Sequence, residues 1–454
     1  MKKYLLTLLI LLSACSKDIL EDDIIIIDDN DDDIVTVQNP FEHLEKPNYL
    51  DPSHYTRIPY LHTNYEDMYN TYGTGLVKDN FVGPPRDAVV IDYNGDGYYD
   101  LVHSGTDWEK SFQANITDDD YLGNHYREKI QFFYGNEKGE LTLDVAMSNK
   151  FWGLLHGFKG NVNDYNNDGI PDMLFAGTGW HGNGDYNGDL TYLNHEYPTM
   201  LLSKGIGEYE QINFYDLKRN YDHSVSSGDY DNDGDVDVIF ISAGLRPEWV
   251  EEYEQMESGY ILKNNGGEFE IVPLGSVIPS HNLMFNKFSS ELVDINNDGF
   301  LDLLLGGDKM VDSHILLGDG VDFKNGIIEI PGVPNYDFGM DFAVYDYDKD
   351  GDKDIILNRI PDRDSGSHYE GWYIQVLKNE GGNFIDASST DITDNSFMGG
   401  TYWINFIHIV DFDNDGIVEL FNNTIDRNSD YTPCPTCNKP KLEWELIDGK
   451  FIKK

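Results

Sequence analysis

The chain has 454 residues and a formal net charge of −50, with 82 acidic residues against 32 basic ones. This charge excludes nucleic acid as a partner class, because binding it needs a basic surface. The length would hold two or three average domains, but internal repeats favour one large domain, since a repeated unit cannot bury its faces alone.

The first residues form a targeting segment rather than part of the fold. MKKYLLTLLILLSAC has a basic start, an apolar stretch too short to span a bilayer comfortably, and small residues before Cys15. LSAC resembles a bacterial lipoprotein signal, which implies loss of residues 1–14, a lipid on Cys15 and a membrane partner. The following SKDILEDD resembles the acidic export tag of Bacteroidetes-type lipoproteins and implies an outer-membrane protein exposed on the cell surface. If this stretch is only linker, the anchor faces the periplasm.

Two further segments precede the repeats. Residues 15–40 are predicted to be an acidic tether, since the acids of DDIIIIDDNDDDI repel one another and extend the chain. The four isoleucines leave open an edge strand added to a sheet. Residues 41–85 are rich in Tyr and lack an acidic loop, so they form a collar or a degenerate seventh unit.

A short acidic loop then recurs six times. DYNGDGYYD, DYNNDGIPD, DYDNDGDVD, DINNDGFLD, DYDKDGDKD and DFDNDGIVE start at residues 92, 164, 229, 294, 346 and 411, at intervals of 72, 65, 65, 52 and 65 residues. In the third loop, Asp229, Asp231, Asp233 and Asp237 occupy positions one, three, five and nine, with Gly234 at position six. Calcium takes six to eight oxygen ligands in flexible geometry, so this spacing predicts calcium rather than magnesium.

The loops lie between strands. None has the Glu at position twelve that an EF-hand needs, and the flanking residues are β-branched and aromatic. A glycine-containing hairpin follows each loop, as in YILKNNGGEFEIV and IQVLKNEGGNFIDA. Each unit therefore reads as four antiparallel strands, and such units repeated around an axis predict an all-β propeller with six blades, or seven with the N-terminal segment.

The loop and its spacing resemble those of the FG-GAP/VCBS repeat proteins, whose blades also build the propeller of integrin α-subunits. The resemblance covers residues 86–454. It implies about six calcium ions, held by the residues at positions one, three, five and nine of each loop. These are Asp92, Asn94, Asp96 and Asp100; Asp164, Asn166, Asp168 and Asp172; Asp229, Asp231, Asp233 and Asp237; Asp294, Asn296, Asp298 and Asp302; Asp346, Asp348, Asp350 and Asp354; and Asp411, Asp413, Asp415 and Glu419. Glu419 departs from the pattern.

The opposite end of the blades is predicted to carry long connectors rich in aromatic residues. Side chains there could stack on sugars, anchor a protein partner or simply pack the loops down. The candidates for a ligand face are Trp108, Trp180, His181, Trp249, Trp372 and Trp403. Cys434 and Cys437 in the last connector are predicted to form a local disulfide, because an exported protein meets an oxidising compartment.

Three functions remain open on the sequence. The preferred one is a calcium-stabilised surface protein that binds glycan or protein. The second is a polysaccharide-processing lyase or hydrolase with its site on the connector face, and the third is a structural or adhesion component. No sequence motif of a hydrolase or metalloprotease favours the enzyme, and fold alone does not choose among the three.

Overall fold

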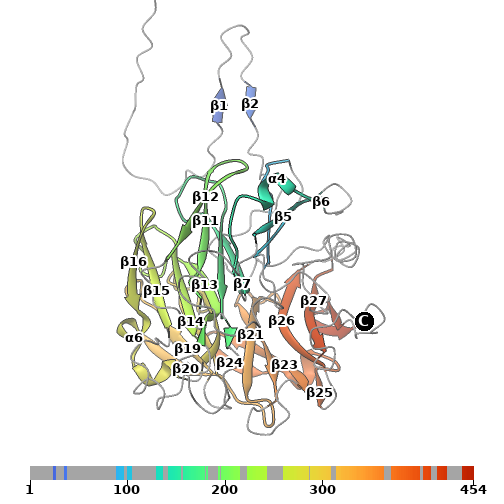
Figure 1. The fold of residues 1–454 in the computed structure, drawn as a ribbon. Coiled ribbons are helices and arrows are strands. Elements are labelled where there is room, and N and C mark those ends of the chain that lie inside the picture. Colours follow the sequence, from blue (N-terminus) through green and yellow to red (C-terminus); the bar gives the residue numbers. More distant parts are fainter. Residues whose placement is uncertain are drawn as a thin grey trace, which may run out of the picture.

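The computed structural model of the chain describes residues 24–26, 35–37, 88–96, 100–104, 129–135, 142–154, 157–178, 180–181, 193–194, 196–214, 222–242, 259–285, 287–307, 313–361, 370–398, 402–410, 417–426 and 442–454. Within these residues the protein is all-β, as predicted, and is built from six four-stranded antiparallel sheets in chain order (Figure 1).

The first three sheets each pair their strands in the order of the chain. The first comprises β3 (Ala88–Ile91), β4 (Asp100–His103), β5 (Gln131–Tyr134) and β6 (Thr142–Leu143). The second comprises β7 (Gly157–Asn163), β8 (Asp172–Gly177), β11 (Thr199–Gly205) and β12 (Glu208–Asn213). The third comprises β13 (Asp222–Gly228), β14 (Asp237–Ser242), β15 (Gly259–Asn265) and β16 (Glu268–Pro273).

The last three sheets repeat this order. The fourth comprises β17 (Lys287–Val293), β18 (Asp302–Gly307), β19 (His314–Leu317) and β20 (Gly326–Glu329). The fifth comprises β21 (Phe338–Tyr345), β22 (Asp354–Ile360), β23 (Gly371–Glu380) and β24 (Asn383–Asp386), and β25 (Ser396–Met398) also pairs with β23. The sixth comprises β26 (Tyr402–Val410), β27 (Glu419–Asp426), β28 (Glu443–Ile447) and β29 (Lys450–Lys453).

Short elements complete the described structure. Single helical turns follow the fourth strands of three sheets, namely α4 (Val145–Ser148), α6 (Leu274–Val277) with η4 (His281–Met284), and α7 (Ser388–Asp391). Between β8 and β11 the chain forms a small hairpin of β9 (Trp180–His181) and β10 (Leu193–Asn194). No helix in the described segments is long and apolar enough to cross a membrane.

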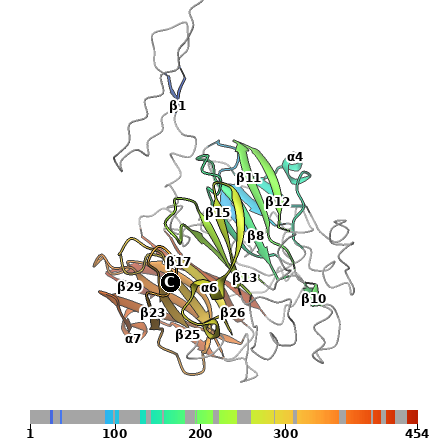
Figure 2. The same ribbon diagram turned by 90° about the vertical axis from the view of Figure 1, so that its left-hand side faces the viewer.

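The isoleucine-rich segment near the N-terminus does not extend any of the six sheets. Its β1 (Ile24–Ile26) pairs with β2 (Val35–Val37) as a separate two-stranded hairpin. Figure 2 shows β1 standing apart from the sheets. The alternative of an added edge strand is therefore wrong for these residues, because neither β1 nor β2 pairs with a strand of the six sheets.

The core lies between successive sheets. In β14, Val238 and Phe240 pack with residues of the second sheet, whereas Ile239 and Ile241 pack with residues of the fourth. Side chains of a strand alternate between its two faces, so a strand buried on both faces needs apolar residues at every position. This explains the continuous apolar runs DMLFAG, DVIFIS, DLLLGG and DIILNR, which are buried throughout.

The first strands of successive sheets also contact one another, from β3 through β7, β13, β17 and β21 to β26. Figure 1 shows several of these strands near the middle of the molecule. Each of β7, β13, β17 and β21 has a β-bulge six residues before its acidic loop, at Phe158, His223, Phe288 and Met340. A bulge re-aims a side chain, and sequence reasoning did not single out Phe158, Phe288 or Met340.

The bulged residues meet in one aromatic cluster. His223 stacks on Phe158 with ring centroids 4.1 Å apart and meets the edge of Phe288 at 4.0 Å. Phe158 of the second sheet also lies 6.1 Å from Phe406 of the sixth. The row of sheets therefore curves back, so that its second and last described members touch.

Candidate metal centre

The acidic loop joins the first and second strands of each sheet, and its first aspartate holds the turn together. In the third loop the two carboxylate oxygens of Asp229 accept hydrogen bonds from the backbone N–H of Asp233, at 3.0 Å, and of Gly234, at 2.9 Å. Asp164, Asp294 and Asp346 accept the same pair of bonds in their loops. The repeated sequence therefore forms one repeated local structure.

Two positions in each of the second to fifth loops have a left-handed backbone. Position six is glycine, and Gly234 has φ of 98°, a region that a Cβ disfavours. Position four is also left-handed although it is mostly not glycine, with φ of 59° at Asn232 and 62° at Lys349. Asn tolerates this conformation better than most residues, which accounts for its recurrence there. Lys349 keeps the same geometry because the hydrogen bonds on either side impose it.

The aspartate at position nine starts the second strand and joins three parts of the sheet. Oδ2 of Asp237 accepts from the N–H of Tyr230 in the loop, and Oδ1 accepts from the N–H of Asn264 on β15, at 2.8 Å. Every described aspartate at this position accepts one hydrogen bond from a loop N–H and one from an N–H in the third strand or directly after it. We name this group the position-nine aspartates: Asp100, Asp172, Asp237, Asp302 and Asp354. All five are fully buried.

This burial raises the pKa of the position-nine carboxylates. Loss of hydration raises the pKa of Asp237 to about 8, and the charges of Asp231 and Asp233 add to the rise, while the backbone donors oppose it. Burial likewise raises the pKa of Asp354 to about 7. A cation among these carboxylates would favour their charged form, so its binding would release the protons that they hold.

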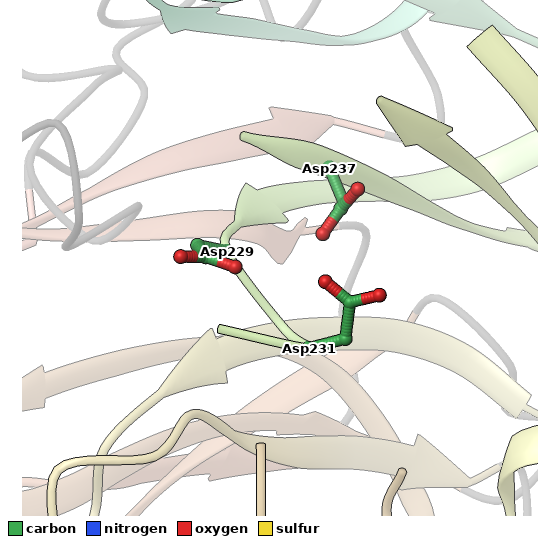
Figure 3. A group of neighbouring side chains, drawn as sticks. All are labelled: Asp229, Asp231 and Asp237. Atoms are coloured by element: carbon green, nitrogen blue, oxygen red, sulfur yellow. The ribbon is translucent and has the colours of Figure 1, made fainter. Parts of the chain in front are cut away.

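Two of the described loops bring three carboxylates close together. One oxygen from each of Asp229, Asp231 and Asp237 lies within 4.8 Å of the others, and Figure 3 shows these side chains side by side. Asp346, Asp348 and Asp354 form the matching group in the fifth loop. Oδ1 of Asp231 is buried and has no hydrogen-bond partner among the described residues. A cluster of carboxylate oxygens with an unused acceptor fits a hard divalent cation.

The loops share one end of the sheets with the hairpin turns between third and fourth strands, as the topology predicts. Oδ2 of Asp235 accepts from the N–H of Gly266, and Oδ2 of Asp352 accepts from Gly381. Neighbouring loops also touch, since Nδ2 of Asn167 donates to Oδ1 of Asp235 at 2.7 Å. The described loops thus lie at one end of the sheets as an acidic rim, in which the second and third loops are in contact.

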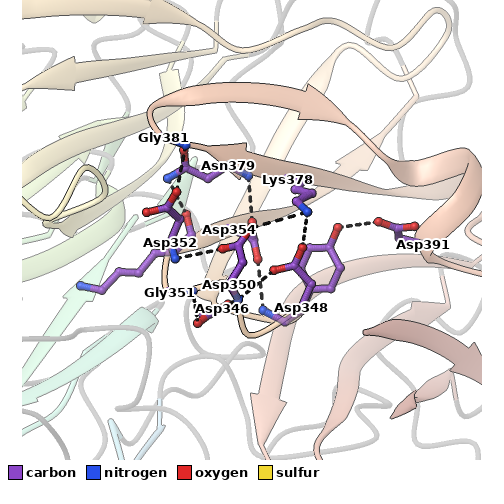
Figure 4. Close-up of polar contacts among 12 residues, drawn as sticks. Asp346, Asp348, Asp350, Gly351, Asp352, Asp354, Lys378, Asn379, Gly381 and Asp391 are labelled. Atoms are coloured by element: carbon purple, nitrogen blue, oxygen red, sulfur yellow. Dashed lines mark hydrogen bonds and ion pairs between the residues drawn. The ribbon is translucent and has the colours of Figure 1, made fainter. Parts of the chain in front are cut away.

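A basic residue that sequence reasoning missed enters each of the two convergent clusters. Lys263 of β15 forms ion pairs with Asp231 and Asp233, and Lys378 of β23 lies 2.5 Å from Asp348 and 3.5 Å from Asp350 (Figure 4). The hydrogen bond to Asp231 raises the pKa of Lys263 above its usual value. The available signal was the third-strand sequence, where Lys precedes Asn in both KNNGG and KNEGG.

Other predicted site residues are only partly described. Glu419 starts β27 and is buried, but Asp411, Asp413 and Asp415 lie outside the described residues. Trp180 and His181 lie in the β9–β10 hairpin and Trp403 in β26, where only the backbone is described. Cys15, Trp108, Trp249, Cys434 and Cys437 also lie outside the described residues.

Trp372 does not belong to a connector surface. It is the second residue of β23, its side chain is 3 % exposed, and it meets the ring of Trp444 edge-on at 5.7 Å. Both rings belong to the core between the fifth and sixth sheets. The expectation that Trp372 faces a ligand is therefore wrong in this structure, since packing between the sheets covers the ring.

Comparison with known proteins does not assign this chain to a family. No protein-family model matches the sequence, and no curated protein matches it. Among solved structures, the Tc holotoxin pore of Photorhabdus luminescens is similar over 80 % of this chain, with 12 % identity and a TM-score of 0.22. This chain spans 19 % of that much longer protein. A likeness of this size carries no argument about fold or function.

Proposed function

We propose that the six sheets are blades of a calcium-stabilised β-propeller of the FG-GAP/VCBS type, displayed on the cell surface to bind an extracellular glycan or protein. The observation that carries the proposal is the recurrence of one hydrogen-bonded acidic loop at the same end of successive sheets. In two of these loops the carboxylates of positions one, three and nine approach within 4.8 Å of one another.

The propeller arrangement is supported by contacts near the middle of the molecule. First strands of successive sheets touch in order, and Phe158 and Phe406 bring the second and sixth sheets together. A further contact crosses the same region, since Nζ of Lys159 lies 3.6 Å from Oε2 of Glu291, between the second and fourth sheets. Sheets placed radially around one axis would produce these contacts, whereas a straight row would separate these strands.

Calcium at the loops would serve stability. The residues that would hold it are those at positions one, three, five and nine, and the carbonyl of position seven supplies a further oxygen. A bound ion stabilises the folded state because the unfolded chain has no assembled site. The loops lie at the ends of the strands that build the core, so the ion would tie the first, second and third strands of a blade together.

The cellular role rests on the sequence. The segment before Cys15 supports a lipid anchor in the outer membrane, and the acidic SKDILEDD stretch supports display outside the cell. Ligand binding is assigned to the end opposite the acidic loops, where the connectors that contain Trp108, Trp180 and Trp249 arise. Aromatic side chains on connectors of a rigid scaffold suit recognition of sugars or proteins.

A calcium titration of the metal-free protein tests this function. We expect several ions to bind, with calcium preferred over magnesium, and a screen of glycans to give binding without turnover. Absence of calcium binding at millimolar concentration would overturn the metal assignment. Turnover of a glycan that binds would replace the binding role with a polysaccharide-processing one.

A further inference from the structure

The first five acidic loops fall into two classes that differ in their number of carboxylates. The third and fifth loops have Asp at positions three and seven as well as at positions one, five and nine, so each carries five carboxylates. The first, second and fourth loops have Asn at position three and an apolar or aromatic residue at position seven, so each carries three. Ionised carboxylates this close together repel one another unless a cation compensates them.

Among the described loops, the third strand of the sheet supplies a lysine at this position only where the loop has five carboxylates. Lys263 and Lys378 directly precede the residues whose N–H groups bond to Asp237 and Asp354. In the other described loops the residue before the same N–H donor is Tyr134, Leu202 or Leu317. The lysines therefore occur at one structural position, and only beside loops with five carboxylates.

Both ammonium groups lie between the carboxylates of positions three and five. Nζ of Lys263 contacts Asp231 and lies 3.2 Å from Oδ2 of Asp233. Nζ of Lys378 contacts Asp348 and Asp350 in the same way (Figure 4). The side chains of Lys263 and Lys378 are 24 % and 28 % exposed.

In the loops with three carboxylates, neutral groups donate hydrogen bonds to the carboxylate at position five. Nδ2 of Asn94 donates to Asp96 at 3.1 Å, and Nδ2 of Asn296 donates to Asp298 at 3.0 Å. In the second loop the hydroxyl of Ser203 donates to Asp168 at 2.7 Å. The position-five carboxylate is therefore hydrogen-bonded to a neutral donor in every loop of this class.

We propose that Lys263 and Lys378 are tethered counter-ions that occupy the two five-carboxylate loops and must move aside when a divalent cation binds. This proposal rests on the proposed calcium binding. The lysine ammonium is a compact charge on a flexible four-carbon stem, so it fills the place of a cation and can still swing toward solvent. A metal ion and the ammonium compete for the carboxylates of positions three and five.

Two consequences follow for these loops. The lysine stabilises the metal-free loop by offsetting carboxylate repulsion, so the protein keeps its fold when calcium is scarce. It also weakens the apparent affinity for calcium, because only the fraction of molecules with the lysine displaced is ready to bind. Calcium binding at the third and fifth loops would therefore need a higher calcium concentration than the carboxylates alone would require. At the first, second and fourth loops no lysine at this position competes with calcium.

The test compares calcium binding by the full protein with that of Lys263→Met, Lys378→Met and the double variant, each measured by competition with a chromophoric chelator. We expect one binding constant to tighten about tenfold in each single variant and two in the double variant. We also expect the metal-free double variant to melt several degrees lower than the metal-free parent protein, and this difference to disappear in saturating calcium.

Two control variants isolate the effect. Lys204→Met removes a lysine from the third strand of the second sheet, where its contact is the exposed Glu210 at 3.0 Å, and it should leave every constant unchanged. Lys263→Arg keeps the charge and should stay within about twofold of the parent protein. If the methionine variants fold only with calcium, melting at a series of buffered calcium concentrations gives the same comparison, since stability rises with ligand above its dissociation constant.

The outcomes separate this inference from the function on which it rests. Calcium binding with unchanged or weaker affinity in the methionine variants overturns the counter-ion role and leaves the calcium function intact. No calcium binding by the parent protein overturns both. Tighter binding in Lys204→Met as well would assign the change to net charge rather than to the ammonium in the loop.

Discussion

The two ends of the sheets differ in how closely their loops resemble one another from sheet to sheet. At the loop end, position-one and position-nine aspartates make the same backbone hydrogen bonds from sheet to sheet. At the opposite end, the connector between second and third strands is long in the first sheet, from His103 to Gln131, and short in the fourth, from Gly307 to His314. The uniform end is suited to stabilising the fold and the variable end to recognition.

This difference has a physical basis. Loop geometry is dictated by hydrogen bonds between residues a few positions apart, so loss of the aspartate at position one or nine leaves backbone N–H groups of the turn without their acceptor. Connectors carry no such constraint, and insertions in them cost little entropy. Changes at the loop end should therefore alter metal content and stability, and changes at the connector end should alter ligand affinity.

Removal of metal should produce the largest effect. Each ion bound at about 100 times its dissociation constant stabilises the fold by roughly 2.7 kcal/mol, and several sites act together. We expect a chelator to lower the melting temperature on the order of 10 °C or more, with recovery by calcium and less recovery by magnesium. An unchanged melting curve after complete removal of metal would show that the loop end is held by hydrogen bonds alone.

The pH dependence of the metal-free protein should come next. Burial raises the folded pKa of Asp237 to about 8 and of Asp354 to about 7, against an ordinary value of 3.8. Between these values the folded state binds more protons than the unfolded state, so the contribution of these carboxylates to stability is full below pH 4 and is lost as pH rises toward 8.

The measurement for this prediction is thermal unfolding in chelator at pH 6 and pH 8. We expect the melting temperature to be higher at pH 6, by on the order of 5 °C, because five position-nine aspartates act together. Saturating calcium should remove or reverse the trend, since the ion favours the charged carboxylates. The same trend with and without calcium would place the titrating groups elsewhere in the protein.

A substitution in one loop should remove one calcium ion. Asp231→Ala removes a ligand from a convergent cluster, so it should lower the calcium count by about one and cost about 3 kcal/mol in saturating calcium. Asp413→Ala should matter less, because Glu419 already departs from the pattern of the sixth loop. Glu210→Ala, which removes an exposed charge that pairs with Lys204, is the control. Equal losses in the third and sixth loops would show that Glu419 serves as well as Asp.

The smallest effects should come from the connector end. Trp180→Ala and Trp249→Ala should each weaken ligand binding by about 1–3 kcal/mol if they anchor it, and should leave the calcium count unchanged. Trp372→Ala is the contrasting variant, because its ring is in the core. It should lower stability by about 3–5 kcal/mol without a selective loss of affinity. A ligand that tolerates both connector changes but is lost with Asp231→Ala would bind at the acidic rim.

The sequence by itself determined the features that depend on near neighbours. The six four-stranded units, the turns closed by Asp229 and its equivalents, and the strands buried on both faces all follow from short-range patterns. A turn is decided by hydrogen bonds across a few residues, and a strand by the period of its side chains. A stretch of nine or ten residues is long enough to contain these signals.

Only the tertiary structure decided which distant side chains meet. Lys263 reaches Asp231 across 32 residues of chain, the bulges at Phe158 and Phe288 aim their rings into one cluster, and Trp372 is covered by Trp444 of the next sheet. Each outcome depends on strand register and on the packing of one sheet against another. A sequence states that such residues are apolar or charged, but register and packing determine what they touch.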